Sequence, residues 1–496
     1  MYPEPNCTQL LSLSHDLSGE CGAECEMILP DYCPNILRIL QTTATVSILS
    51  KTVNADRLTV EGKAEYRILY LAEDGGGFQS ASQQTLFSCT MDRKQNENTE
   101  YTVKAKIQNC AARALNPRKI FVRCTVQITA KADGNQILKH PDSMENYEQK
   151  PCRETVAKLL CSAEKPLRIS DDFEGENRSV AKLLQTHVFF RETEQKPLTD
   201  KLIVKADMMF DLLCADENGR IFPLRKTLPI SQILDLPGLE TESICHVGFE
   251  PIFVSITPPE EGKTALSYDV EVNVSCKCYA KTSAAWTEDV FSVKKTLECE
   301  KETVSIHDFI PIRETGPVRE TVEIGMCSEL LWAEATPDLR QMQYDSESDR
   351  ILCHGLWNCR ILMIDGEGSP AALQREIPFT LAVPAEGHTN PVRNDTEMLL
   401  SDLTWTQTDA NHMELRGNYH WSGLIFTEKS VKIITQTKEV SDRPKDTDTV
   451  ILYYAEAGES AWDIAKEHAC PYKDLQRENA LLQDKISENK MLILLR

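Results

Sequence analysis

Hydrophobic and polar residues alternate without a break along one stretch near the N-terminus, LTVEGKAEYRILY. Apolar or small side chains occupy every second position from Leu58 to Tyr70, and polar side chains fill the positions between them from Thr59 to Arg67. Because successive side chains of a strand point to opposite faces, the pattern predicts a β-strand with one buried face.

The same alternation returns twice, starting at Leu202 and at Ile351. An acidic residue and a basic residue precede each copy, and a cluster of acidic residues and glycines follows it. Such clusters favour hairpin turns, since they tolerate the positive φ that tight turns require. The pairs are Asp56-Arg57, Asp200-Lys201 and Asp349-Arg350, and the clusters begin at Glu73, Asp216 and Asp365.

A second alternating strand keeps a nearly constant distance from the first in all three copies. The intervals from Leu58 to Ile120, Leu202 to Leu266, and Ile351 to Met413 are 62, 64 and 62 residues. Chance alignment would not hold two strands at one spacing three times. The sequence therefore predicts a mainly β fold with three homologous antiparallel β-sandwich-like domains in tandem.

Polar and proline-containing stretches between the copies suggest where these domains begin and end. We expect a short connecting helix at Glu154–Glu164, where apolar residues cluster on one side, and a link at Thr303–Arg319. The expected units are an arm at 1–30, β domains at 31–150, 151–300 and 301–440, a charged linker at 441–448 and a small C-terminal domain at 449–496.

The last fifty residues follow a different pattern, which predicts the order strand, helix, helix, strand. Ser460 is placed to cap the first helix, with Asp463 three residues later, and Pro471 suits the start of the second. The expected strands are Val450–Tyr454 and Met491–Leu495, and the expected helices are Ala461–His468 and a second one that carries Leu475 and ends near Asn479.

Composition narrows the possible functions. A net charge of −22 argues against a nucleic-acid partner, which calls for a basic face. No apolar run approaches the roughly 20 residues that span a bilayer, and no signal peptide is visible, so we expect a cytoplasmic protein without an integral membrane segment. Of the eighteen cysteines, several occupy inward strand positions, where a reduced thiol acts as a small hydrophobe.

The C-terminal unit resembles the LysM domain through its Gly458-Glu-Ser460 turn, the Trp462-Asp-Ile-Ala465 helix start, Leu475, Asn479 and the final apolar strand. LysM domains usually bind N-acetylglucosamine-containing glycans between two loops. Where that family commonly reads Pro-Gly-Gln before the last strand, this chain reads Ser487-Glu-Asn-Lys490.

Three β repeats ahead of a LysM-like unit resemble the SPOCS-domain proteins of spore-forming Firmicutes, and among them the SipL-type spore coat morphogenetic proteins of clostridia. The resemblance implies a non-enzymatic scaffold in spore coat assembly, located in the mother cell at the developing forespore surface. It implies that the LysM domain docks to the stage IV sporulation protein A-type ATPase, and that other coat proteins bind elsewhere.

Chemistry-bearing motifs do not alter this interpretation. The chain contains no Gly-x-Ser-x-Gly, His-Glu-x-x-His or Gly-x-Gly-x-x-Gly motif, so we expect no catalytic residues, cofactor or metal. The alternative is a wall or cortex protein that binds peptidoglycan through LysM. In either case the candidate binding residues are Ala457, Gly458, Glu459, Ser460, Trp462 and Lys490; for Trp462 a core role is favoured over a ligand groove.

Overall fold

The computed structural model describes residues 5–14, 16–54, 56–75, 77–93, 101–141, 147–175, 178–259, 264–443 and 450–495. Nearly all of this chain forms antiparallel strands, and its two α-helices both lie in the last fifty residues, which confirms the mainly β prediction. Within these ranges no helix combines the length and apolar character needed to cross a bilayer.

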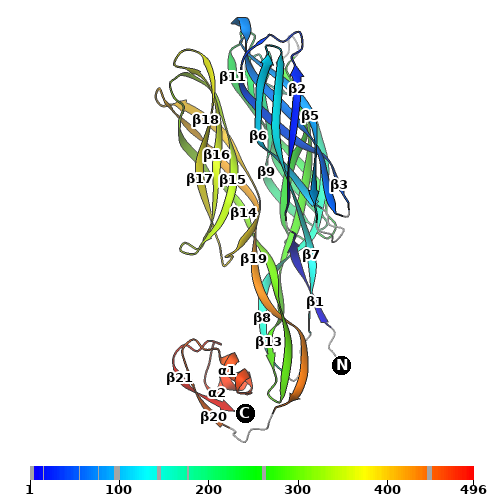
Figure 1. Ribbon diagram of the computed structural model, residues 1–496, viewed down its shortest axis with the longest axis vertical. Helices are drawn as coiled ribbons and strands as arrows, with labels where there is room; N and C mark the ends of the chain where they lie inside the picture. Colours follow the sequence, from blue (N-terminus) through cyan, green and yellow to red (C-terminus); the bar gives the residue numbers. More distant parts are fainter. Residues whose placement is uncertain are drawn as a thin grey trace.

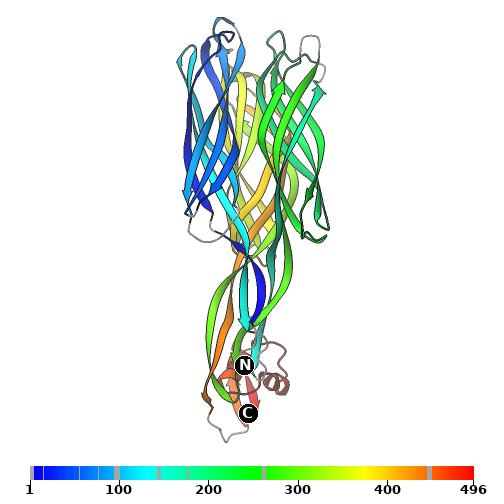
Figure 2. The ribbon, with the colours of Figure 1, turned by 90° about the vertical axis from the view of Figure 1, so that its right-hand side faces the viewer.

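The strands of the three repeats form three lobes, each built from two sheets with apolar side chains packed between them (Figures 1 and 2). Lobe 1 contains β2 (Leu17–Ile28), β3 (Ile36–Val53), β4 (Arg57–Ala72), β5 (Phe78–Asp92), β6 (Tyr101–Asn116) and β7 (Lys119–Pro141); β1 (Pro5–Leu13) precedes it, and a 3-10 turn (Glu73–Gly75) follows β4. Lobe 2 contains β8 (Glu148–Glu174), β9 (Lys182–Leu198), β10 (Lys201–Ala215), β11 (Ile221–Asp235), β12 (Ile244–Thr257) and β13 (Ala265–Phe291). Lobe 3 contains β14 (Lys295–Glu323), β15 (Cys327–Asp345), β16 (Arg350–Asp365), β17 (Pro370–Pro384), β18 (Pro391–Gln407) and β19 (His412–Asp442).

The two strands predicted from the repeats are the central strands of the sheets. β4, β10 and β16 each lie between two neighbours, and β7, β13 and β19 do the same in the facing sheets. The first apolar residue of each predicted strand, such as Leu58, Leu202 and Ile351, is completely buried. The glycine-containing clusters close the hairpins β4–β5, β10–β11 and β16–β17, with positive φ at Gly75, Gly219 and Gly368.

Several strands run on beyond their lobes and wind together into a stalk (Figures 1 and 2). Its three ribbons are β1 with the end of β7, the start of β8 with the end of β13, and the start of β14 with the end of β19. Side chains from all three ribbons share two apolar clusters, one around Trp286 and Ile433 and one around Phe309 and Phe426. The stalk thus has its own apolar core, separate from the cores of the lobes.

The stalk corrects two expectations from the sequence. Glu154–Glu164, expected to be a helix, belongs to β8, and Thr303–Arg319, expected to be a link, belongs to β14. The physical reason is burial on both faces: Val156 packs in one stalk cluster and the next residue, Ala157, packs in the other. Apolar residues therefore follow one another directly along the sequence, and the alternation of apolar and polar residues that identifies a strand is absent.

The lobes stand side by side around a common axis: in the side view of Figure 2, lobes 1 and 2 flank the axis and lobe 3 lies behind them. Leu69, Leu213 and Leu362 occupy the same position in β4, β10 and β16, and all three meet in one buried cluster between the lobes. The expected boundaries at 150/151 and 300/301 fall within β8 and β14. Of the expected arm, residues 17–28 form β2, which pairs with β7 as a strand of lobe 1.

The C-terminal unit lies at the end of the stalk opposite the lobes (Figure 1). It contains β20 (Val450–Ala455), α1 (Ala461–Glu467), α2 (Tyr472–Glu478) and β21 (Lys490–Leu495), in the order predicted from the sequence. Ser460 caps α1 by accepting a hydrogen bond from the backbone N–H of Asp463 at 3.2 Å. The expected linker lies mostly outside the described residues, and its first two residues belong to β19.

Candidate functional site

The C-terminal unit is fastened to the stalk through Trp462. This side chain is 1% exposed and packs edge-on against Phe291 at the tip of β13, with ring centroids 5.0 Å apart, and against Tyr472 of its own unit. Its indole N–H donates to the Asp289 carboxylate at 2.8 Å. The structure thus places Trp462 inside a contact between the C-terminal unit and the stalk.

Asp289 is the centre of this attachment. Its carboxylate also accepts from Lys466 of α1 at 2.8 Å and pairs with Lys301 of β14 at 2.7 Å. Burial alone would raise the pKa of Asp289, but these donors outweigh it and lower the pKa to about 2. The aspartate is therefore charged at neutral pH and joins three elements. A second tie is the ion pair between Lys150 of β8 and Asp484, 3.2 Å apart.

The loop that carries the other candidate residues is bonded to the segment before β21. The backbone N–H of Ala457 donates to the Asn489 side chain at 2.7 Å, and that of Gly458 donates to the carbonyl of Ile486 at 2.8 Å. The Ser460 hydroxyl reaches Asp484 at 3.1 Å. The two loops lie together as expected, and their backbone groups are largely engaged with each other.

Glu459 and Lys490 lie at the two margins of this loop pair. The Glu459 carboxylate accepts from the Tyr453 hydroxyl at 3.2 Å and from the backbone N–H of Glu456 at 3.0 Å. Lys490 is half-buried and pairs with Ala455 at the start of β21. Ala457 and Gly458 are exposed, so the tip of the loop is open to a partner.

A more prominent surface on this unit is the outer face of the β20–β21 hairpin. Leu452, Tyr454 and Met491 are 65%, 59% and 55% exposed, although all three are large and apolar. The strand register places Leu452 opposite Ile493 and Tyr454 opposite Met491, so these side chains form one continuous patch. An exposed apolar patch of this kind is typical of a protein–protein contact. We call Val450, Leu452, Tyr454, Met491 and Ile493 the hairpin patch.

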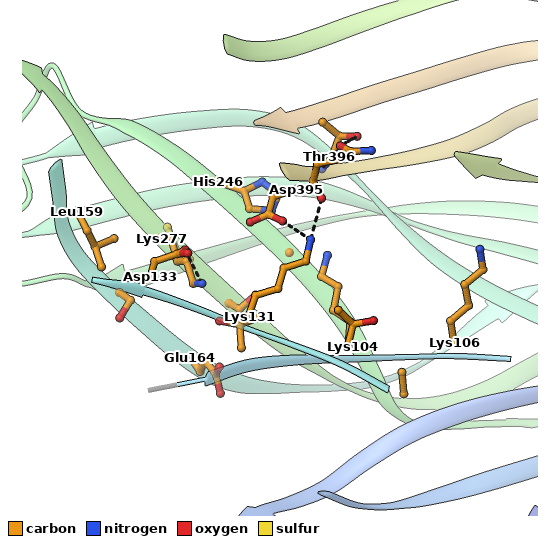
Figure 3. Close-up of a pocket in the computed structure, with 18 of the residues that line it drawn as sticks. Lys104, Lys106, Lys131, Asp133, Leu159, Glu164, His246, Lys277, Asp395 and Thr396 are labelled. Atoms are coloured by element: carbon orange, nitrogen blue, oxygen red, sulfur yellow. Dashed lines mark hydrogen bonds and ion pairs between the residues drawn. The ribbon is translucent and has the colours of Figure 1, made fainter. Parts of the chain in front are cut away.

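At the other end of the stalk, a cavity of about 850 Å³ lies where the three lobes meet (Figure 3). β6 and β7, β12 and β13, and β15 and β18 bring polar side chains to it from all three lobes. Lys131 of β7 pairs with Asp395 of β18 at 2.5 Å, and Lys104 of β6 pairs with Glu397 at 2.6 Å. These ion pairs cross from lobe 1 to lobe 3.

Asp133 links lobes at the base of this cavity. It accepts from Lys277 and from the Tyr279 hydroxyl of lobe 2, both at 2.8 Å, and it pairs with Arg393 of lobe 3. Burial would raise the pKa of Asp133, but the positive charges of Lys277 and Arg393 outweigh it and keep the pKa below its usual value. Since its lysines already have carboxylate partners, the cavity acts mainly as a polar fastening between lobes.

The sequence identified the loops of the C-terminal unit but missed the hairpin patch and the cavity. The patch carried a signal, because Leu452 and Tyr454 continue the apolar run on the phase opposite to the buried Ala455. The cavity carried none, since Lys104, Asp133 and Asp395 belong to different repeats and are brought together only by the packing of the lobes.

Comparison with known proteins adds one match. Residues 35–115 match the family model described as SipL, SPOCS domain. The matched segment covers β3 to β6 of lobe 1, and β9 to β12 and β15 to β18 hold the same places in the other lobes. No curated protein and no solved structure matches the chain. The fold and the match together indicate a multi-lobed β protein related to sporulation.

Proposed function

We propose that this protein is a non-enzymatic scaffold of spore coat assembly, located in the mother cell at the forespore surface. In this proposal the three lobes are SPOCS-like domains, the C-terminal unit is a LysM-type domain, and the latter docks to a stage IV sporulation protein A-type ATPase. The family match supports the connection with sporulation. The three lobes would offer surfaces to other coat proteins.

The observation that carries the proposal is the position of the hairpin patch. The patch lies on a small unit at the end of a stalk, far from the lobes (Figure 1), so a large partner can approach it without meeting the rest of the chain. Trp462, by contrast, is already used in attaching the unit. Docking through the patch therefore leaves the attachment intact.

The test is binding of the full-length chain to the purified ATPase by biolayer interferometry. Leu452→Asp places a charge at the centre of the patch, and we expect at least a tenfold loss of affinity, about 1.4 kcal/mol or more. The matched control is Leu86→Asp, because Leu86 is an apolar residue of similar exposure, 72%, on β5 of lobe 1. Unchanged binding by Leu452→Asp would contradict docking through the patch.

The loop residues are tested in the same assay. Ala457→Arg adds a long cation at the exposed loop tip without disturbing a buried side chain. Weaker binding by this variant alone would move the docking surface from the patch to Ala457–Ser460.

The alternative function is binding of peptidoglycan or N-acetylglucosamine oligomers, as expected for a wall or cortex protein. The strand–helix–helix–strand order of the C-terminal unit favours it. Calorimetric titration with chitooligosaccharides separates the two functions, since a glycan groove gives saturable heat. For the scaffold we expect no saturable heat with glycan and saturable binding of the ATPase.

A further inference from the structure

Four cysteines lie next to one another across three neighbouring strands of lobe 2. Cys278 of β13 is paired in register with Cys245 of β12 on one side and with Cys161 of β8 on the other. Cys276 precedes Cys278 by two residues and therefore points to the same face of the sheet. Each of the four is a free cysteine.

The sulfur atoms of three of them form a compact group. The Sγ atoms of Cys245 and Cys278 are 3.0 Å apart, those of Cys276 and Cys278 are 3.5 Å apart, and all three lie within 4.8 Å of one another. The thiol of Cys161 also contacts that of Cys278 from the opposite strand. Three sulfur atoms thus converge on one face of the sheet, and Cys161, which lies outside that 4.8 Å group, is the next thiol on the same face.

An apolar core can be filled by any side chains of suitable size, so it does not account for four neighbouring thiols. Cys276 and Cys278 are almost fully buried in the core of lobe 2, whereas Cys245 and Cys161 are half-buried at its margin. A thiolate is the form in which cysteine binds a metal.

We propose that Cys245, Cys276 and Cys278, with Cys161 as the fourth ligand, bind one zinc ion. A Zn–S bond of about 2.3 Å in tetrahedral geometry places sulfur atoms roughly 3.8 Å apart. The Cys245–Cys278 and Cys276–Cys278 pairs therefore need to separate by less than about 1 Å, whereas the Cys161 side chain has to move toward the other three. On binding, each thiol releases its proton to solvent and a Zn–S bond takes its place. The half-buried pair provides the route of entry.

The choice of zinc follows from the donors. Soft thiolate ligands exclude magnesium and calcium, which take oxygen ligands, and four thiolates match a closed tetrahedral zinc site. Because the ligands come from β8, β12 and β13, the ion would tie together all three strands of one sheet, near the point where that sheet enters the stalk.

The test uses the full-length reduced chain, stripped of metal and then loaded with Co²⁺ as a spectroscopic substitute for Zn²⁺. We expect a thiolate-to-cobalt charge-transfer band and the intense visible bands of tetrahedral cobalt, both of which Zn²⁺ displaces. Cys278→Ser should abolish the bands and remove one equivalent of tightly bound zinc. Cys161→Ser should weaken zinc binding while leaving a three-sulfur spectrum.

The matched control is Cys214→Ser. Cys214 is buried in the core of the same lobe, on β10 of the facing sheet, and burial alone raises the pKa of its thiol. This variant should keep the bands and the zinc equivalent, so that a loss common to both variants would point to disturbed packing and overturn the proposal.

A second measurement does not depend on variants. Zn²⁺ should protect Cys245 and Cys161 of the unaltered chain from alkylation, as read by mass spectrometry of their peptides. Absence of protection, exclusive binding of Cu⁺, or a Cys245–Cys278 disulfide in the protein isolated from its native cells would each overturn the zinc site.

Discussion

At the scale of single residues, the central strands show how closely the facing side chains match. Gly62 of β4 lies opposite Phe87, and Gly355 of β16 lies opposite Phe379, so each glycine leaves room for an aromatic ring. In the second copy Ala206 replaces the glycine, and its partner is the smaller Ile230. The combined volume of the two facing side chains is thus similar in the three repeats, although both residues of the pair differ in the second copy.

Gly62→Ala should therefore destabilise lobe 1. A Cβ at this position would lie 2.3 Å from the Phe87 ring and 2.7 Å from the carbonyl oxygen of Ser47, and the backbone oxygen cannot move aside. We expect a loss of about 1–3 kcal/mol in the free energy of unfolding. Urea denaturation followed by circular dichroism measures it.

The control for this prediction is Gly134→Ala. A Cβ at Gly134 meets nothing within 4 Å, so stability should change by no more than about 1 kcal/mol. Adding Phe87→Ile to Gly62→Ala reproduces the pairing of the second copy and should recover part of the loss. If the single and double variants are equally unstable, the steric explanation is wrong.

At the scale of elements, the C-terminal unit is held to the stalk by a small number of polar contacts around one aromatic cluster. Asp289 serves α1 and β14 at once, and Phe291 provides the apolar surface beside it. Because Asp289 is buried and its partners are cations and an indole N–H, its removal leaves donors without an acceptor.

Asp289→Ala should loosen this attachment by about 1.5–3 kcal/mol, the usual contribution of a hydrogen bond to a charged group. Hydrogen exchange read by mass spectrometry should show faster exchange in α1 and at the tip of β13, with no change in the lobes. Asp474→Ala is the control, because its pair with Arg477 at 3.0 Å lies on the surface of α2 and contributes little. Equal exchange in both variants would show that Asp289 does not hold the unit.

At the scale of the whole molecule, the lobes are joined by a buried polar group on the common axis as well as by the leucine cluster. Glu334 of lobe 3 pairs with His187 of lobe 2 at 3.0 Å and with Arg360 at 3.0 Å, and the Gln41 amide of lobe 1 is 3.5 Å away. Asp211 of β10 also faces His187. One carboxylate thus contacts side chains of all three lobes.

This group makes the association of the lobes depend on pH. Burial would lower the pKa of His187, but the Glu334 carboxylate outweighs it and raises the pKa above the ordinary value of 6.5. A raised pKa means that the stabilisation is fully present below about 6.5 and is lost as the pH rises through the folded-state value.

His187→Gln should therefore be less stable than the unaltered chain at pH 6, and the difference should shrink steadily toward pH 8.5. Thermal unfolding by calorimetry across this range measures it. His354→Gln replaces a histidine that bonds to Thr380 on the surface of lobe 3, and it should show no such trend. A difference that does not vary with pH would exclude the charged His187–Glu334 pair.

The features of the fold that could be predicted from the sequence are those whose contacts lie within a single lobe or a single element. β4, β10 and β16 bury one face against their own lobe, so the alternation from Leu58 to Tyr70 was sufficient to identify the strand. The capping of α1 by Ser460 is local, and it too was visible in the sequence. Such elements depend on nearby residues and on a single buried face.

The stalk and the sites could not be found in this way. Val156 and Ala157 are buried mostly by strands more than a hundred residues away, and Trp462 of the C-terminal unit is covered by Phe291 of lobe 2. The four cysteines left only the weak signal of Cys276 and Cys278 on one strand face. Contacts of this kind depend on how complete lobes pack, which no local pattern encodes.

The stalk also determines how the protein responds to force. Its three ribbons run along the long axis of the molecule, and β7, β8, β13, β14 and β19 continue from them into the lobes (Figures 1 and 2). A force that pulls the C-terminal unit away from the lobes therefore acts parallel to the strands. In this direction, many hydrogen bonds between paired strands must break together rather than one after another. A partner that pulls on the C-terminal unit would therefore distribute the force over all three lobes, because each lobe contributes one ribbon to the stalk.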